Sequence, residues 1–408
     1  MQHNDNLSEE VFARLCSNKY FGGFVYQNPK FTLDTEREAG DVVLWVRDSL
    51  IIFEVIWRNP KSGSNTKSFI KDIGKKRDQL LGDFQIYENP NLLISMQSEH
   101  GEHTWYDHEQ FNDQKTTGVV IVDARGPIGK LHHDTVRLTA EAPLPIAVMT
   151  RDDFETLLVE ADTVSDLGLY LGDRHDFLRT VFNEEPAPFL NLGTNLEQEL
   201  VGLYKLGNNS FDLGAWKTSK DKRFWHKYQI QRAAEIGRRD EENVASESLD
   251  YLSAEIRSQN SENSPTNQHA WEIALLTRRE RAALVSVISR KHERLLESYK
   301  DQKFAFQNQQ TGCWDVYYLH HGLDSEFFQQ EAQNMANRKL WIERSLNNFQ
   351  YSVFCFAMRY TALGLREVVL TVSDAHKWPF ITSEQLQEAQ EFFRGTTHQN
   401  PIVEFPSP

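Results

Sequence analysis

A pair of acids inside an apolar hairpin constrains this chain more than any other feature of its sequence. Residues 36–59 read EREAGDVVLWVRDSLIIFEVIWRN, and two apolar runs around a short polar turn predict two paired strands. Asp41 begins the first predicted strand, and Glu54 stands inside the second. A carboxylate within an apolar strand is costly unless it is paired or bound to a cation. The fold must therefore provide a partner for these acids.

The hairpin register brings the two acids together. A turn at residues 47–48 sets Asp41 opposite Glu54, and directly opposed side chains have Cβ atoms about 4.5–5.5 Å apart. Two carboxylates at that distance repel each other, and one takes up a proton unless a cation bridges them. Mg²⁺ is suited to this place, because it is usually held by one or two carboxylates together with water and phosphate. The alternative is that Asp41 only begins an edge strand and that Glu54 pairs with Arg37, Arg47 or Arg58.

The order of these elements resembles the core of the PD-(D/E)XK nuclease superfamily. That pattern is a helix, an acid at the start of one strand, a second strand carrying (D/E)-x-K, and then a basic helix. The stretch REAGDVVLWVRDSLIIFEV resembles it, within a similarity that covers about residues 8–125. The resemblance implies an α/β fold with a mixed-sheet, restriction-endonuclease-like core. It also implies that Asp41 and Glu54 bind Mg²⁺ or Mn²⁺, with Glu38 or Glu10 as an auxiliary acid.

The third position of the motif departs from the family pattern. The family has a lysine there, which orients or activates the attacking water and stabilises the charge on phosphorus, whereas this chain has Ile56. One explanation is a lysine supplied from elsewhere, either Lys71 or Lys75 of the helix predicted over residues 66–84, or else the guanidinium of Arg58. Gln79 of the same helix resembles a residue that positions the substrate. The other explanation is that the site is inactive.

Two functional hypotheses follow from the resemblance. The first is a metal-dependent endonuclease that hydrolyses phosphodiester bonds, with DNA rather than RNA as the expected nucleic acid and bacterial antiviral defence as the setting. The second is a catalytically inactive, nuclease-like protein that serves as an interaction or scaffold subunit for a protein partner. The net charge of −15 and the isoleucine at position 56 favour the second.

The chain is long enough for several domains, and the pattern of its elements predicts three regions. Residues 1–182 are predicted as the nuclease-like α/β domain, with buried strands at 117–124 and 142–150 and helices at 151–161 and 162–182. Thr163 and Asp166 are spaced as a capping box for the last of these helices. Residues 183–300 are predicted to be mainly helical, with a polar loop at 258–268. Residues 301–408 are predicted as an α+β domain, with strands at 312–321 and 365–373 and a helix at 383–395.

One segment, residues 216–239, is strongly basic. It reads WKTSKDKRFWHKYQIQRAAEIGRR and holds eight lysines and arginines against two acids, with aromatic residues between them. This composition suits phosphate contacts combined with base stacking. The candidate nucleic-acid contacts are Lys217, Lys220, Lys222, Arg223 and Lys227. The alternative is a helix whose aromatic side packs on a core while its basic side faces water.

Composition disfavours several other classes. A net charge of −15 argues against a protein that coats nucleic acid non-specifically. Three cysteines without a CxxC spacing predict neither a disulfide framework nor a zinc site, and the adjacent histidine pairs 132–133 and 320–321 do not suit one either. The glycines lack the GxxxxGK[ST] and GxGxxG spacings, so no nucleotide cofactor is expected. With no apolar run of about 18 residues and a polar N-terminus, we expect a cytoplasmic protein without a membrane span.

Overall fold

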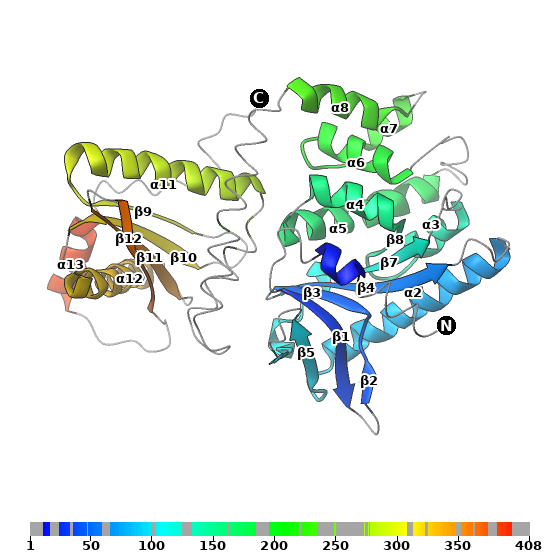
Figure 1. Ribbon diagram of the computed structural model, residues 1–408, viewed down its shortest axis with the longest axis horizontal. Helices are drawn as coiled ribbons and strands as arrows, with labels where there is room; N and C mark the ends of the chain where they lie inside the picture. The colour runs from blue at the N-terminus through cyan, green and yellow to red at the C-terminus, as the bar shows by residue number, and fades with distance from the viewer. Residues whose placement is uncertain are drawn as a thin grey trace. The chain divides into compact units, whose positions relative to one another are not determined.

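The computed structural model of the chain divides into two compact units, residues 1–240 and residues 241–408. Each unit contains its own β-sheet (Figure 1). The structure describes residues 11–16, 24–32, 36–46, 48–58, 66–98, 103–124, 133–161, 163–184, 196–219, 222–234, 249, 273, 276, 278–307, 313–322, 325–347, 352–361, 364–373 and 382–393.

Unit 1 is built around a mixed sheet, so the predicted α/β class is confirmed. In the described part of the unit, the sheet has eight strands in the order β6-β5-β1-β3-β4-β7-β8, with β2 paired to β1. The pairs β4–β7 and β7–β8 are parallel, and the other pairs are antiparallel. The strands are β1 Val25–Thr32, β2 Glu36–Glu38, β3 Val42–Val46, β4 Ser49–Arg58, β5 Ile94–Ser98, β6 His103–Trp105, β7 Thr116–Ala124 and β8 Ile146–Thr150.

Helices cover this sheet on both faces. Helix α2 contributes Ile73, Leu80 and Phe84 to the core on one face, and α4 packs Phe154 against Phe53 on the other. The helices are α2 Thr66–Glu88, α3 His133–Ala140, α4 Arg151–Glu160, α5 Val164–Glu184, α6 Leu196–Leu206, α7 Leu213–Thr218 and α8 Phe224–Ala234. The helices predicted over 66–84, 151–161 and 162–182 are thus confirmed.

The predicted cap of α5 is also present. The backbone N–H of Asp166 donates to the hydroxyl oxygen of Thr163 at 3.1 Å, and that hydroxyl donates to the Asp166 carboxylate at 2.7 Å. Serine, threonine and aspartate side chains satisfy the backbone donors that a helix leaves unpaired at its start. The sequence therefore located the beginning of this helix correctly.

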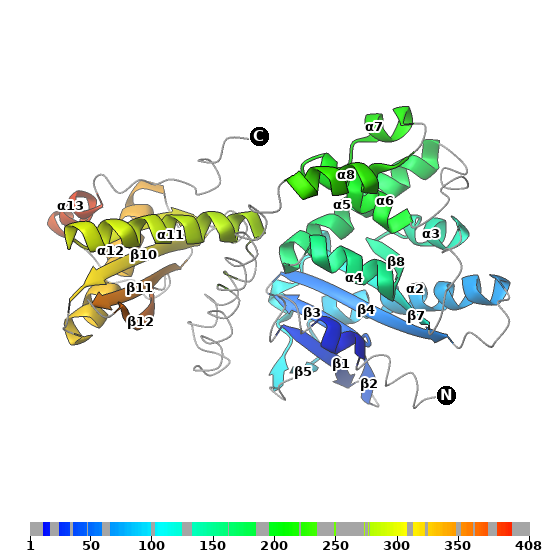
Figure 2. The same cartoon turned by 45° about the horizontal axis from the view of Figure 1, so that its top comes forward.

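Unit 1 extends beyond the predicted domain boundary at residue 182. Helices α6, α7 and α8 lie together on the side of α4 and α5 that faces away from the sheet (Figures 1 and 2). Leu200 of α6, Trp216 of α7 and Phe224 of α8 belong to the same buried cluster as Ile52 of the sheet. The region predicted over residues 183–300 is therefore not one compact body: its first helices complete the core of unit 1. The polar loop predicted at 258–268 lies outside the described residues.

Unit 2 is a smaller sheet with helices on its two faces. The described strands run in the order β12-β11-β10-β9, where β10 and β11 are parallel and the outer pairs antiparallel. Its elements are α11 Arg278–Ser298, β9 Gln302–Gln307, β10 Trp314–His321, α12 Ser325–Asn347, β11 Val353–Thr361, β12 Gly364–Ser373 and α13 Ser383–Phe392. Tyr318 of β10 packs with Phe328 of α12, whereas the neighbouring Tyr317 packs with Leu284 of α11. The strands predicted at 312–321 and 365–373 and the helix predicted from 383 are present.

Strand β1 was not predicted, because its sequence VYQNPKFT carries the signals of a loop. Asn28 adopts a φ of 42°, and the pairing of β1 with β5 shifts register between Gln27 and Lys30. The Asn-Pro step therefore marks an irregularity within a strand and not the end of one. The strand predicted from residue 142 begins only at Ile146.

Candidate active site

The β3–β4 hairpin brings Asp41 and Glu54 together, in the register that the sequence predicted. Val46 pairs with Ser49 and Val42 with Phe53, which sets the residues that follow in β4 beside Asp41. The backbone N–H of Asp41 donates to the Phe53 carbonyl at 3.0 Å, and Asp41 Oδ2 accepts from the backbone N–H of Val55 at 2.6 Å. Glu54 is fully buried and Asp41 is 7% exposed. Both acids are thus held in the interior of the sheet.

The cation that joins these acids is Lys76 of helix α2. Its Nζ lies 3.3 Å from Asp41 Oδ2 and also donates to Glu54 Oε2. Lys71 and Lys75, which the sequence analysis favoured, are exposed on the same helix. Lys76 was missed, although its spacing carried a signal. It lies three residues after Ile73 and four before Leu80, both of which are buried, so it shares the inward face of the helix.

Two further side chains of α2 reach the same place. Gln79 Nε2 donates to Glu54 Oε1 at 2.8 Å, so the structure places the predicted Gln79 in the site. One turn later, Asp83 is 4% exposed, and its Oδ2 has no hydrogen-bond partner in the part of the chain that the structure describes. The sequence analysis did not select Asp83.

Burial and mutual repulsion set the protonation of this cluster. Burial, followed by the negative charge of Asp41, raises the pKa of Glu54 well above its usual value, although Lys76 opposes this shift. Burial likewise raises the pKa of Asp83 to about 7, although its interaction with the Glu54 side chain lowers it. Burial alone would lower the pKa of Lys76, but Asp41 and Glu54 together raise it. The lysine therefore remains a charged donor. The cluster contains three carboxyl groups and one ammonium group, so acidic groups outnumber basic ones.

Ile56, at the position where the resemblance led us to expect a lysine, is part of the packing of unit 1. Side chains alternate along a strand, so Ile56 shares the face of Ile52 and Glu54. It is half-buried and packs against the main core of unit 1. The side chain of Arg58, the other donor considered from the sequence, lies outside the described residues.

The auxiliary acids are placed less centrally. Glu38 is exposed on β2, where it pairs with Lys30 of β1. Glu10 lies outside the described residues. Across the described ranges, no group of three or more His, Cys, Asp or Glu side chains is arranged to hold a metal ion. The candidate ligand set is therefore the pair Asp41 and Glu54, and two carboxylates are a usual protein contribution to an Mg²⁺ site.

The aromatic residues of the basic stretch are part of the protein core. Trp216, Phe224 and Tyr228 are buried, and Trp216 stacks on Phe224 with ring centroids 5.9 Å apart. These rings are therefore covered and do not offer faces for base stacking. Trp225 of the same stretch is only half-buried.

The cations of this stretch pack on that core or pair with acids. Lys222 Nζ lies 4.2 Å from the Trp216 ring centroid and Lys227 Nζ lies 5.6 Å from that of Phe224. Lys217 forms an ion pair with Glu184 at 2.6 Å. Arg223 is exposed, and Lys220 lies outside the described residues. The arrangement favours the alternative of a helix packed on the core with a solvated basic side.

The chain matches no protein-family model, no curated protein and no solved structure in the comparisons made. Within the described parts of the chain, no helix is both long enough and apolar enough to cross a membrane. The functional conclusion therefore depends on the geometry of the cluster formed by Asp41, Glu54, Lys76, Gln79 and Asp83.

Proposed function

We propose that unit 1 is a metal-dependent nuclease domain of the PD-(D/E)XK type, in which Lys76 replaces the motif lysine. The observation that carries this proposal is the contact of one ammonium group with both acids of the hairpin, Asp41 and Glu54. In the family pattern, the lysine belongs to the strand that carries the second acid. Here the ammonium comes from the helix after that strand, and isoleucine can occupy the strand position.

The charge state of Lys76 determines what it would do. A lysine that stays protonated is a hydrogen-bond donor and a fixed positive charge, not a general base. Between the two acids, it would orient a water molecule for attack and stabilise the negative charge that develops on the phosphate. Gln79, which donates to Glu54 at 2.8 Å, would hold that carboxylate in place.

The donor set fits a hard divalent cation such as Mg²⁺ or Mn²⁺. Asp41 and Glu54 offer carboxylate oxygens, and the buried Asp83 Oδ2, which has no hydrogen-bond partner among the described residues, adds to the surplus of acid. When bound, the cation would supply Lewis-acid stabilisation of the charge on the phosphate. The residues of the chain would supply its binding, the orientation of the water and one further positive charge.

The exposed flank of α2 suits a nucleic-acid substrate. Lys71 and Lys75 are exposed and one helical turn apart, on the helix that carries Lys76. Cations in this position would contact phosphates that flank the scissile bond, which is the usual way for a protein to position a nucleic-acid backbone. DNA as the preferred substrate and bacterial defence as the setting are parts of the same proposal.

The test is incubation of the purified full chain with plasmid DNA, linear DNA and RNA, each with Mg²⁺, Mn²⁺ or EDTA. We expect cleavage of DNA that requires the metal and that is lost in Asp41→Asn. The matched control is Asp78→Asn, which changes an exposed acid of α2. If the wild type cuts none of the three substrates with either metal, the nuclease proposal is wrong and a non-catalytic interaction protein is favoured.

A further inference from the structure

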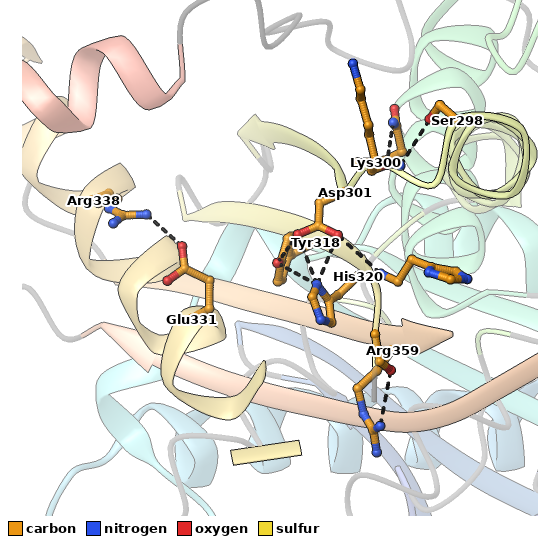
Figure 3. A network of polar contacts seen from close by, with 11 residues as sticks. Ser298, Lys300, Asp301, Tyr318, His320, Glu331, Arg338 and Arg359 are labelled. Atoms are coloured by element: carbon orange, nitrogen blue, oxygen red, sulfur yellow. Dashed lines mark hydrogen bonds and ion pairs between the residues drawn. The ribbon is translucent and has the colours of Figure 1, made fainter. Parts of the chain in front are cut away.

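A second polar cluster lies in unit 2, around His320 at the carboxyl end of β10 (Figure 3). The imidazole Nδ1 lies 3.0 Å from each carboxylate oxygen of Asp301, which immediately precedes β9. A carboxylate only accepts hydrogen bonds, so Nδ1 carries a proton and donates it. The other ring nitrogen, Nε2, is then left to face outward from this pair.

The surroundings hold both residues in place. The Tyr318 hydroxyl donates to Asp301 Oδ2 at 2.6 Å, and the backbone N–H of His321 donates to Oδ1 at 3.2 Å. The imidazole stacks on Phe328 of α12, with ring centroids 5.8 Å apart. A carboxylate that orients a histidine in this way fixes the ring and its tautomer, as it does for histidines that bind a ligand through the other nitrogen.

The Nε2 edge of the ring is kept open. The side chain of His320 is only 12% exposed, and Nε2 has no hydrogen-bond partner among the described residues. A Cβ at position 322 would lie 2.5 Å from Nε2, so any residue other than Gly322 would cover this atom. Glycine at this position thus preserves access to a ring nitrogen that lacks a partner among the described residues.

The groups around this edge suit an anion. Arg359 of β11 is the parallel-sheet partner of His320, so their side chains share one face, and its Nη1 lies 3.4 Å from the carbonyl oxygen of Gly322. Helix α12 begins at Ser325, three residues after Gly322, so its N-terminus is close in sequence to the carboxyl end of β10. Anions are commonly bound at the carboxyl ends of parallel strands, where such helices start.

We propose that this cluster binds a phosphomonoester group, with His320 Nε2 as hydrogen-bond donor and Arg359 as the second cation. In the imidazolium form both ring nitrogens donate, one to Asp301 and the other to a phosphate oxygen. Phe327 is 56% exposed and its ring centroid lies 6.2 Å from that of His320, so an aromatic base joined to the phosphate would have a surface to stack on. The ligand is a mononucleotide or the phosphorylated end of a nucleic-acid strand. This site is independent of the nuclease proposal, because it lies in the other unit.

The test is isothermal titration calorimetry of the full chain in EDTA, with inorganic phosphate, a 5′-mononucleotide, and one oligonucleotide with either a 5′-phosphate or a 5′-hydroxyl end. We expect the phosphorylated ligands to bind and the 5′-hydroxyl oligonucleotide to bind more weakly than its phosphorylated form. Tighter binding of the phosphorylated oligonucleotide than of the mononucleotide identifies a strand end as the ligand. The reverse order identifies a free nucleotide.

Four variants decide whether His320 is responsible. His320→Phe keeps the ring on Phe328, Gly322→Ala covers Nε2, and Asp301→Asn keeps an acceptor for Nδ1 without its charge. Each should weaken phosphate binding by at least about tenfold, because a charge-assisted hydrogen bond is lost or blocked. His321→Gln is the matched control, since its side chain points to the opposite face of the strand, and it should bind as the wild type does. Absence of phosphate binding in the wild type, or equal affinity in His320→Phe and Gly322→Ala, would overturn the proposal.

Discussion

Replacement of Lys76 by methionine should destabilise unit 1 in a way that depends on pH. Methionine keeps most of the length of the side chain but removes the ammonium that contacts Asp41 and Glu54. At neutral pH the variant must either bury uncompensated carboxylates or take up a proton. The loss of stability should therefore be largest at high pH and smaller in acid.

The size of this effect follows from the burial of the three groups. Loss of one partner of a buried ion pair costs about 3–5 kcal/mol. The Lys76 side chain is 25% exposed, while Glu54 is fully buried and Asp41 nearly so, which places the expected loss near the lower end, at about 3 kcal/mol at pH 7.5. A urea m-value of about 3 kcal/mol/M would convert this loss into a midpoint lower by about 1 M.

The sign of the pH dependence is fixed by the Glu54 carboxyl. Its pKa in the folded wild type is already raised by burial and by Asp41, and loss of the ammonium raises it further. Between the usual value and the raised one, the folded state binds more protons than the unfolded state, so stability falls as pH rises.

Urea unfolding of the full chain at pH 5.0 and pH 7.5 measures this difference. Lys75→Met, a change at an exposed neighbour, is the control and should shift neither midpoint. If Lys76→Met and Lys75→Met unfold at the same urea concentration at both pH values, the ammonium does not compensate buried charge. The contact of Lys76 with Asp41 and Glu54 would then not be the central interaction of the site.

Three further outcomes test other parts of the structure. Because burial raises the pKa of Asp83 to about 7 from an ordinary value of 3.8, the metal-free wild type should lose stability as pH rises between these values. Asp83→Asn should make that slope shallower in thermal melts with EDTA, leaving the part that Glu54 contributes, and an unchanged slope would contradict the burial of Asp83. Burial lowers the pKa of His175, so the imidazole takes up its proton at a higher pH in the unfolded chain than in the folded one, and stability should fall as pH drops below about 6.5. His175→Phe should reduce this fall in urea unfolding. An equal fall in the variant would refute the role of His175. Alanine at Lys217, Lys222 and Arg223 together should leave the salt dependence of DNA binding unchanged in fluorescence anisotropy titrations. If the slope of log K against log salt concentration became smaller by about three, the basic stretch would be part of the nucleic-acid interface.

The hairpin and its acids could be predicted from sequence because local rules decide them. Alternation of side chains and a short turn define the register of β3 and β4, so Asp41 and Glu54 were found together. The start of α5 followed in the same way from the spacing of Thr163 and Asp166. Such features depend on residues that are close in the chain.

Local rules do not identify the cation of the site, because its identity depends on which face of α2 packs against the sheet. Lys71, Lys75 and Lys76 are chemically alike, and only the side of the helix that packs on β4 distinguishes them. The burial of Ile73 and Leu80 fixes that side and turns Lys76 inward. The three- and four-residue spacing of Lys76 from these apolar residues is the signal in the sequence that marks it.

The extent of unit 1 was missed for a related reason. Helices α6, α7 and α8 follow a polar boundary-like stretch, but their apolar residues complete a core formed earlier in the chain. The buried rings of Trp216 and Phe224 belong to this packing, and their interleaving with lysines had suggested base stacking. Long-range burial of this kind leaves no local pattern that separates it from a binding surface.

In the proposed nuclease site, Lys76 performs the role of the motif lysine. Single-turnover cleavage of DNA with Mg²⁺ should be about 10²–10⁴-fold slower in Lys76→Ala than in the wild type, the usual range for a lost catalytic side chain. The double variant Lys71→Ala, Lys75→Ala keeps the ammonium in the site and should retain the wild-type rate of the chemical step at saturating DNA. Addition of Ile56→Lys to Lys76→Ala would return a lysine to the strand position beside Glu54 and should restore part of the lost rate. A cleavage rate in Lys76→Ala equal to that of the wild type would contradict this role of Lys76.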